Sequence, residues 1–208
     1  MKNFNNLIIN EGYLNNIDFF SGGNGSSIFL NNKKFIDLSF CNGTLLLGHN
    51  SKILRKSLKE IAEQNISVMA TPNTQAKKFS KIIKKIIPYG NKFVFCNTGT
   101  EAITKSLRIC RSISSKKLII SVSGSWHGSV DNLLFIPDKN LKPQPLSAGL
   151  SDYNKKNIKF IPYNDIGLSE KIIKKFKKDI NCIVVEPIQG CLPMEGAREY
   201  LKFLKTIS

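Results

Sequence analysis

The chain has 208 residues, enough for one or two domains with a sizeable core. Hydrophobic residues make up 41% and charged residues 22%, which is ordinary for a folded chain and argues against wholesale disorder. No apolar run is long enough to cross a bilayer and no apolar signal core follows the N-terminus, so we expect a cytoplasmic protein without a membrane span. The five cysteines form no CxxC pair, which indicates thiols in a reducing compartment and no cysteine-built metal site.

The net charge of +16 raises the question of a nucleic-acid partner. Only four of the 31 basic residues are arginine, the residue best suited to phosphate and base recognition. The lysines of 77–87 and 170–180 recur on one side of helical patterns whose other side is apolar. Lysine, asparagine and isoleucine are all abundant, and they share A/T-rich codons. The sequence therefore favours solvated lysine faces over nucleic-acid binding.

In the first part of the chain, the sequence predicts one hairpin and two helices between loops. Residues 1–25 are rich in asparagine and glycine, and His49 is interpreted as a structural histidine in a loop. In chain order, the sequence predicts an arm or loop over 1–25, a β-hairpin over 27–38, a loop over 40–50, a helix capped by Ser51 that ends near residue 63, and a helix over 74–87.

After residue 92 short apolar runs alternate with amphipathic helical patterns. Strands that are apolar throughout argue for a mainly parallel α/β sheet covered by helices on both faces. Residues 139–153 are expected to form a long loop. The predicted strands are 93–96, 117–122, 132–136, 159–163 and 182–185, and the predicted helices are 101–112, 170–180 and one that begins near 195.

The first candidate site is the turn Asn97–Thr100, which follows a predicted strand and opens a helix. Free N–H groups at a helix N-terminus, with the hydroxyls of Thr98 and Thr100, can bind a phosphate dianion. Gly99 would let the backbone approach the anion closely. A plain threonine N-cap followed by Glu101 explains the same residues equally well, so both interpretations stay open. Neither GxxxxGK[ST] nor GxGxxG is present in the turn.

Two further candidates lie directly after predicted strands. Trp126, the single tryptophan, could stack on a flat ring at the carboxyl end of its strand, and His127 could donate a proton nearby. For an isolated Trp-His-Gly turn, structural roles are the commoner explanation. Glu186 ends a fully apolar strand, so its carboxylate is expected at the same edge of the sheet as Trp126.

Taken together and in this order, three motifs resemble the class-III pyridoxal-phosphate aminotransferases, and within that class the glutamate-1-semialdehyde aminomutase branch. The resemblance runs from about residue 21 to the end of the chain. The motifs are Asn97-Thr98-Gly99-Thr100-Glu101-Ala102, Trp126-His127-Gly128 and Val185-Glu186-Pro187, supported by the segments 44–49, 70–74, 131–134 and 162–165.

The resemblance implies pyridoxal 5′-phosphate (PLP) as cofactor and a fold-type-I α/β architecture. The Thr98–Thr100 turn would hold the phosphate, Trp126 would stack on the pyridine ring with support from His127, and Glu186 would take part in a polar network beneath the cofactor. The cofactor-binding positions implied are Thr98, Gly99, Thr100, Trp126, His127 and Glu186.

The family also implies two domains and a homodimer that acts on small amino and oxo compounds. Residues 1–50 would form the N-terminal arm and the hairpin of the small domain, and residues 51–208 the first part of the PLP-binding large domain. The aspartate that pairs with the pyridine nitrogen and the Schiff-base lysine have no counterpart among the matching motifs. We therefore expect an N-terminal fragment without catalytic residues, with an open sheet edge and poor solubility.

A second interpretation stays open. The 208 residues would then be a non-catalytic remnant or a basic surface-binding protein. Salt-sensitive binding of DNA or RNA distinguishes the basic binding protein from the enzyme.

Overall fold

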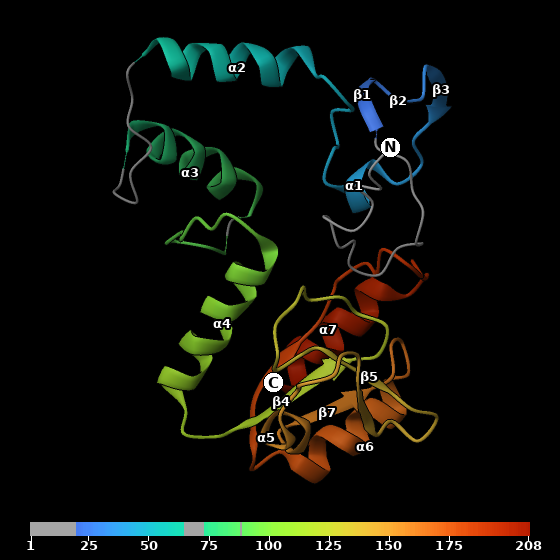
Figure 1. The fold of residues 1–208 in the computed structure, drawn as a ribbon. Coiled ribbons are helices and arrows are strands. Elements are labelled where there is room, and N and C mark those ends of the chain that lie inside the picture. The colour runs from blue at the N-terminus through green and yellow to red at the C-terminus, as the bar shows by residue number, and fades with distance from the viewer. Residues whose placement is uncertain (1–19, 65–72, 88) are drawn as a thin grey trace. The chain divides into compact units, whose positions relative to one another are not determined.

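Three parallel strands form the centre of the second half of the chain (Figure 1). The computed structural model describes residues 20–64, 73–87 and 89–208. It divides the chain into two units, Met1–Asn73 and Thr74–Ser208. The functional division expected at residue 50 stays a prediction. Among the helices that the structure describes, none is both long and apolar enough to cross a membrane.

The first unit contains an antiparallel sheet in the order β1-β2-β3, with β1 (Phe20–Asn24), β2 (Ser27–Leu30) and β3 (Lys33–Ile36). The predicted hairpin is confirmed as β2 and β3. Its turn is the pair Asn31 and Asn32, with φ of 47° and 60°. Asparagine tolerates this left-handed backbone better than most residues, which suits a two-residue hairpin turn. Strand β1 was not expected, because its glycines predict a loop.

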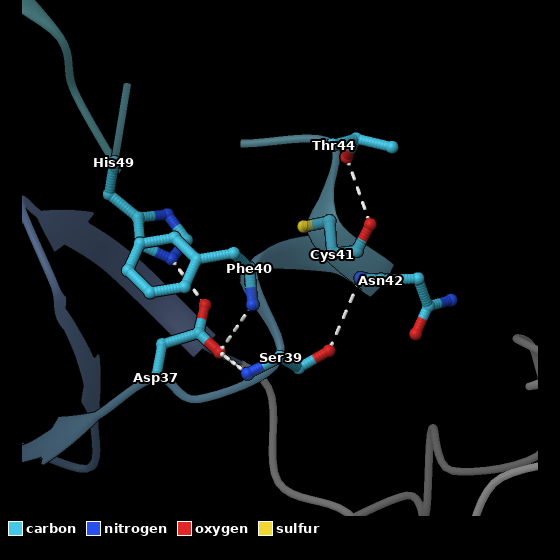
Figure 2. Close-up of polar contacts among 7 residues, drawn as sticks. All are labelled: Asp37, Ser39, Phe40, Cys41, Asn42, Thr44 and His49. Atoms are coloured by element: carbon cyan, nitrogen blue, oxygen red, sulfur yellow. Dashed lines mark hydrogen bonds and ion pairs between the residues drawn. The ribbon is translucent and has the colours of Figure 1, made fainter. Parts of the chain in front are cut away.

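A carboxylate joins this sheet to the segment that follows it (Figure 2). One oxygen of Asp37 accepts hydrogen bonds from the backbone N–H groups of Ser39 and Phe40, at 2.8 and 3.0 Å. The other oxygen lies 2.6 Å from Nε2 of His49, and these contacts hold the pKa of Asp37 below its usual value. The backbone of His49 also pairs with that of Gly25. The structural role predicted for His49 is therefore confirmed.

Two helices complete the first unit, α1 (Phe40–Gly43) and α2 (Lys52–Glu63). Helix α1 is a short turn with a left-handed backbone at Cys41 and Asn42, in the segment predicted as a loop. Helix α2 begins as predicted, with Ser51 as its N-cap. Its apolar residues remain exposed, namely Ile53, Leu54, Leu58 and Ile61.

In the second unit the predicted parallel sheet is confirmed, with the order β7-β4-β8. The strands are β4 (Leu118–Val122), β7 (Ile158–Ile161) and β8 (Ile180–Val184). Every residue of the central strand β4 is buried. Because successive side chains of a strand point to opposite faces, β4 supplies both cores of the unit.

Helices pack against both faces of this sheet. On one face, Leu107 of α4 (Gly99–Ile113) packs with Ile119 and Ile158. On the other face, Ile120 packs with residues of α6 (Ile166–Phe176) and α7 (Ala197–Ile207), including Tyr200. The lysines of α6 lie on its exposed side, as its helical pattern predicts.

The connection between β4 and β7 differs from the prediction. The strand expected at 132–136 is shifted to β5 (Phe135–Pro137) and pairs antiparallel with β6 (Pro143–Pro145), outside the parallel sheet. The carboxylate of Asp138 accepts the N–H groups of Asn140 and Lys142, which reverses the chain between the two strands. The predicted loop over 139–153 therefore contains β6 and the start of α5 (Asp152–Lys156).

The buried strand predicted at 93–96 is wrong. This segment has no strand structure, and the Val94 side chain is 70% exposed. A strand needs a neighbour for its backbone hydrogen bonds, and in the part of the chain that the structure describes no strand pairs with this segment. Helix α3 (Thr74–Ile86) is confirmed, but its apolar side is also largely exposed, as at Phe79 and Ile86.

We predict that Tyr200→Phe loosens the attachment of α7 to the sheet. The buried hydroxyl donates to the backbone oxygen of Pro162 at 2.6 Å and lies 2.9 Å from Oγ of Ser169. Loss of one such bond costs about 1 kcal/mol, so the protected amides of α7 should exchange with deuterium roughly fivefold faster. Tyr163→Phe, which removes an exposed hydrogen bond from a tyrosine hydroxyl to the oxygen of Pro187, is the matched control. Unchanged exchange in Tyr200→Phe would show that this hydroxyl does not hold α7.

Candidate cofactor site

The loops that follow β4 and β8 meet at the carboxyl edge of the parallel sheet. The backbone N–H of Trp126 donates to Oε2 of Glu186 at 3.0 Å. The two residues are 60 positions apart, and they meet because β4 and β8 are parallel neighbours. The expected placement of Glu186 beside Trp126 is therefore confirmed.

The carboxylate of Glu186 also closes its own loop. Its Oε1 accepts the N–H of Gly190 at 2.9 Å, while Oε2 accepts from Trp126. Both oxygens thus accept backbone N–H groups. Glu186 holds two loops together with one side chain.

Gln189 is a site residue that the sequence analysis missed. It is 2% exposed, and its amide nitrogen donates to the backbone oxygen of Ser123 at 2.7 Å and to Oγ of Ser125 at 3.2 Å. Gly124 lies against this amide with φ of +83°, and a Cβ there would lie 2.7 Å from the Gln189 side-chain oxygen. In the sequence, Gln189 is only a polar residue shortly after an apolar strand, and this pattern does not predict that its side chain is buried.

At the start of α4 the residues form a reciprocal helix cap. Oγ1 of Thr98 accepts the N–H of Glu101 at 3.1 Å, and Oε2 of Glu101 accepts the N–H of Asn97 at 2.9 Å. Glu101 also pairs with Lys105, and these contacts lower the pKa of the carboxyl. The interpretation of this turn as a helix cap is therefore confirmed.

The cap leaves hydrogen-bond donors free to bind an anion. The Thr98 hydroxyl accepts a bond from Glu101 and keeps its own proton free to donate. The N–H groups of Gly99 and Thr100 lie in the first turn, where a helix supplies no backbone acceptor. A Cβ on Gly99 would meet no atom within 4 Å, so the space beside it is open. A cap and an anion site are compatible in this turn.

The N-terminus of helix α4 contacts the loop after β4 that carries Trp126, which we call the tryptophan loop. Oγ1 of Thr100 accepts the N–H of Ser129 at 3.1 Å. Gly128 has φ of +74°, and a Cβ there would collide with Oγ1 of Thr100. The loop therefore packs directly on the helix, and glycine is required at the point of closest approach. All three sequence motifs meet at this edge of the sheet.

The two aromatic residues of the loop differ in exposure. The side chain of Trp126 is 61% exposed, whereas His127 is 8% exposed. Nε2 of His127 is buried and has no hydrogen-bond partner among the residues that the structure describes. Burial lowers the pKa of His127, against the opposite effect of the nearby charge of Glu186. The imidazole is therefore neutral near pH 7.

Comparison with known proteins shows the family to which the chain is similar. Residues 10–207 match the class-III aminotransferases. The chain belongs to the class-III aminotransferase family. It is 33% identical over 180 residues to a glutamate-1-semialdehyde 2,1-aminomutase from Methanocaldococcus jannaschii, which covers 84% of this chain and 41% of that relative. The chain thus spans less than half the length of the curated relatives it matches.

Solved structures share the fold of this class-III chain. An omega-transaminase from Sphaerobacter thermophilus aligns with a TM-score of 0.80 at 20% identity, over 91% of this chain and 45% of that one. A glutamate-1-semialdehyde aminomutase from Pseudomonas aeruginosa PAO1 aligns with a TM-score of 0.73 at 18% identity, over 92% and 43%. The expected fold-type-I α/β architecture is confirmed.

The residues at this edge fit a pyridine ring that carries a phosphate. The first turn of α4 offers hydroxyl and amide donors to a dianion, and Trp126 exposes an indole face of the right chemistry for a flat ring. The unpartnered Nε2 of His127 is a buried polar atom that a further group would satisfy. The class-III chain therefore has donors and surfaces suited to PLP.

We predict that His127 titrates below its ordinary pKa of 6.5, because burial disfavours the imidazolium. The two histidines of the chain can be followed by proton NMR, with His49→Gln to assign them. Glu186→Gln should lower the pKa of His127 further, since the glutamate charge favours the protonated ring. The contribution of neutral His127 to stability is complete above pH 6.5 and falls as the pH drops through that value. A pKa at or above 6.5 would contradict the buried placement.

Proposed function

We propose that this chain binds PLP at the carboxyl edge of its parallel sheet and supplies that side of the site in a PLP-dependent amino-group-transfer enzyme. The observation that carries the proposal is the meeting of three separate motifs at one edge, through the bonds of Ser129 to Thr100 and of Trp126 to Glu186. Membership of the class-III family supports the same cofactor.

Each residue has a physical task in this proposal. The hydroxyls of Thr98 and Thr100, with the first-turn amides at Gly99, bind the phosphate. Trp126 packs against the ring, and neutral His127 orients groups beside it through Nε2. Glu186 is a positioning residue, because it fixes the backbone of Trp126. Bound PLP acts as an electron sink for the carbon that carries the amino group.

The relatives in sequence favour the aminomutase branch for the whole protein. Relatives named glutamate-1-semialdehyde 2,1-aminomutase reach 33% identity, whereas structures at 20% identity and below reflect the fold only. An aminomutase converts one substrate without an added oxo-acid, and a transaminase requires two substrates. Turnover of a single amino-aldehyde by the protein that carries this chain is the expected result. A strict requirement for a second substrate would exclude the aminomutase proposal.

We further propose that the protein assembles as a homodimer. Support comes from the apolar sides of α2 and α3, which are exposed within their own units, as at Leu54 and Phe79. Apolar surface of this kind is commonly covered by another chain. Sedimentation of the protein that carries this chain should give twice the monomer mass, and a strict monomer would contradict the proposal.

We predict that pyridoxamine 5′-phosphate changes the fluorescence of Trp126 in a saturable way. This probe has the ring and phosphate of the cofactor but no aldehyde, so it does not react with the lysines of the chain. Thr100→Val removes a hydroxyl donor to the phosphate and should weaken binding about tenfold, as expected for loss of a charge-assisted hydrogen bond.

Two variants control this titration. Thr100→Ser keeps the hydroxyl and should restore binding. Thr104→Val removes the hydroxyl one turn further along α4, which bonds the backbone oxygen of Thr100, and should leave binding within about twofold because it lies outside the first turn. Equal affinity of the probe for the unmodified chain and all three variants would contradict the assignment of Thr100 to the phosphate.

A further inference from the structure

Two adjoining hollows lie away from the candidate cofactor site, along the outer edge of β7 and at the amino end of the sheet. One has a volume of about 480 Å³ and lies between the turn after β5, β7 and α6. The other has a volume of about 540 Å³ and lies among the start of β4, the end of α5 and the connection from α6 to β8. Lys159 and Phe176 line both, so the two hollows lie side by side, and we refer to them together as the groove.

The groove concentrates positive charge. Four separate stretches of the chain, within 115–118, 139–143, 156–160 and 168–179, contribute lysines to its walls, and Asp179 is its one acidic lining residue. Among the described residues none of the groove lysines forms an ion pair, although the charge of Lys142 acts on Asp138. The lysines that line the groove are Lys116, Lys117, Lys139, Lys142, Lys156, Lys159, Lys175 and Lys178.

The shape and composition of the groove indicate an extended anion. A single phosphate would need donors that converge on one point, whereas these lysines are spread along two hollows. The amino groups of Lys159 and Lys175 lie 5.9 and 5.4 Å from the centre of the half-buried Phe176 ring, over its face. No exposed aromatic side chain or arginine lines the groove, so base stacking and bidentate base contacts are not provided.

We propose that this groove binds the phosphate backbone of a nucleic-acid strand without regard to its sequence. A strand carries many phosphates and the groove carries many lysines, each of which acts on a phosphate as a point charge. The helical pattern of 170–180 favoured a solvated lysine face, to which Lys175 and Lys178 of the groove belong. The folded chain instead gathers lysines from the helix, its neighbouring loops and β7 around one concave surface, which a single helical pattern does not reveal.

The test uses the 208-residue chain and fluorescein-labelled dT and rU strands of about 20 nucleotides, long enough to span several lysines of the groove. The replaced lysines are Lys116, Lys142, Lys156 and Lys178, all exposed and each changed to Gln. We expect affinity to fall at least tenfold at low salt. The slope of log K against log salt should become shallower by about 3, because each phosphate that a lysine neutralises on a single strand contributes about 0.7 to that slope.

A matched variant removes the same charge elsewhere. It changes Lys77, Lys78, Lys81 and Lys84 of α3 to Gln, all exposed and outside the groove. Retention of near-native affinity in this variant supports the groove. Equal loss in both variants would attribute binding to net charge and overturn the proposal. Absence of binding to either strand at low salt, or binding to phosphatidylserine vesicles alone, would also overturn it.

Discussion

The parallel pairing of β4 with β8 is the constraint on which the candidate site depends. It places the ends of two strands that are far apart in sequence next to each other, where a single carboxylate can accept backbone N–H groups from both following loops. Glu186 thereby fixes the backbone of Trp126, and the tryptophan loop in turn packs on the N-terminus of α4 through Thr100. Without that pairing Glu186 would not reach the backbone of Trp126.

Much of this arrangement could be predicted from sequence. The strands of the parallel sheet are apolar along their length, and the helices between them have clear amphipathic patterns, so both the elements and their class were predictable. The edge shared by Trp126 and Glu186 followed from a topological rule, since residues after parallel strands gather at one edge. The cap at Thr98 was also contained in its residue types, and the anion site that we propose uses the same turn.

Other features depend on contacts that no local pattern encodes. The apolar segment at 93–96 has the composition of a strand, but pairing depends on a neighbouring backbone. Gln189 resembles any polar loop residue until the fold buries it beneath Ser123 and Ser125. The lysines of the groove belong to different elements, and only the fold brings them to one surface. The apolar sides of α2 and α3 likewise predicted buried helix faces, but within their own units these side chains are exposed.

A crystal structure of the chain grown with pyridoxamine 5′-phosphate shows whether the three motifs of this class-III chain form one site for a phosphorylated pyridine. We expect the phosphate at the first turn of α4, bonded to Thr98 and Thr100, with the ring against Trp126. A phosphate bound instead among the lysines of the groove, with the α4 turn empty, would contradict it.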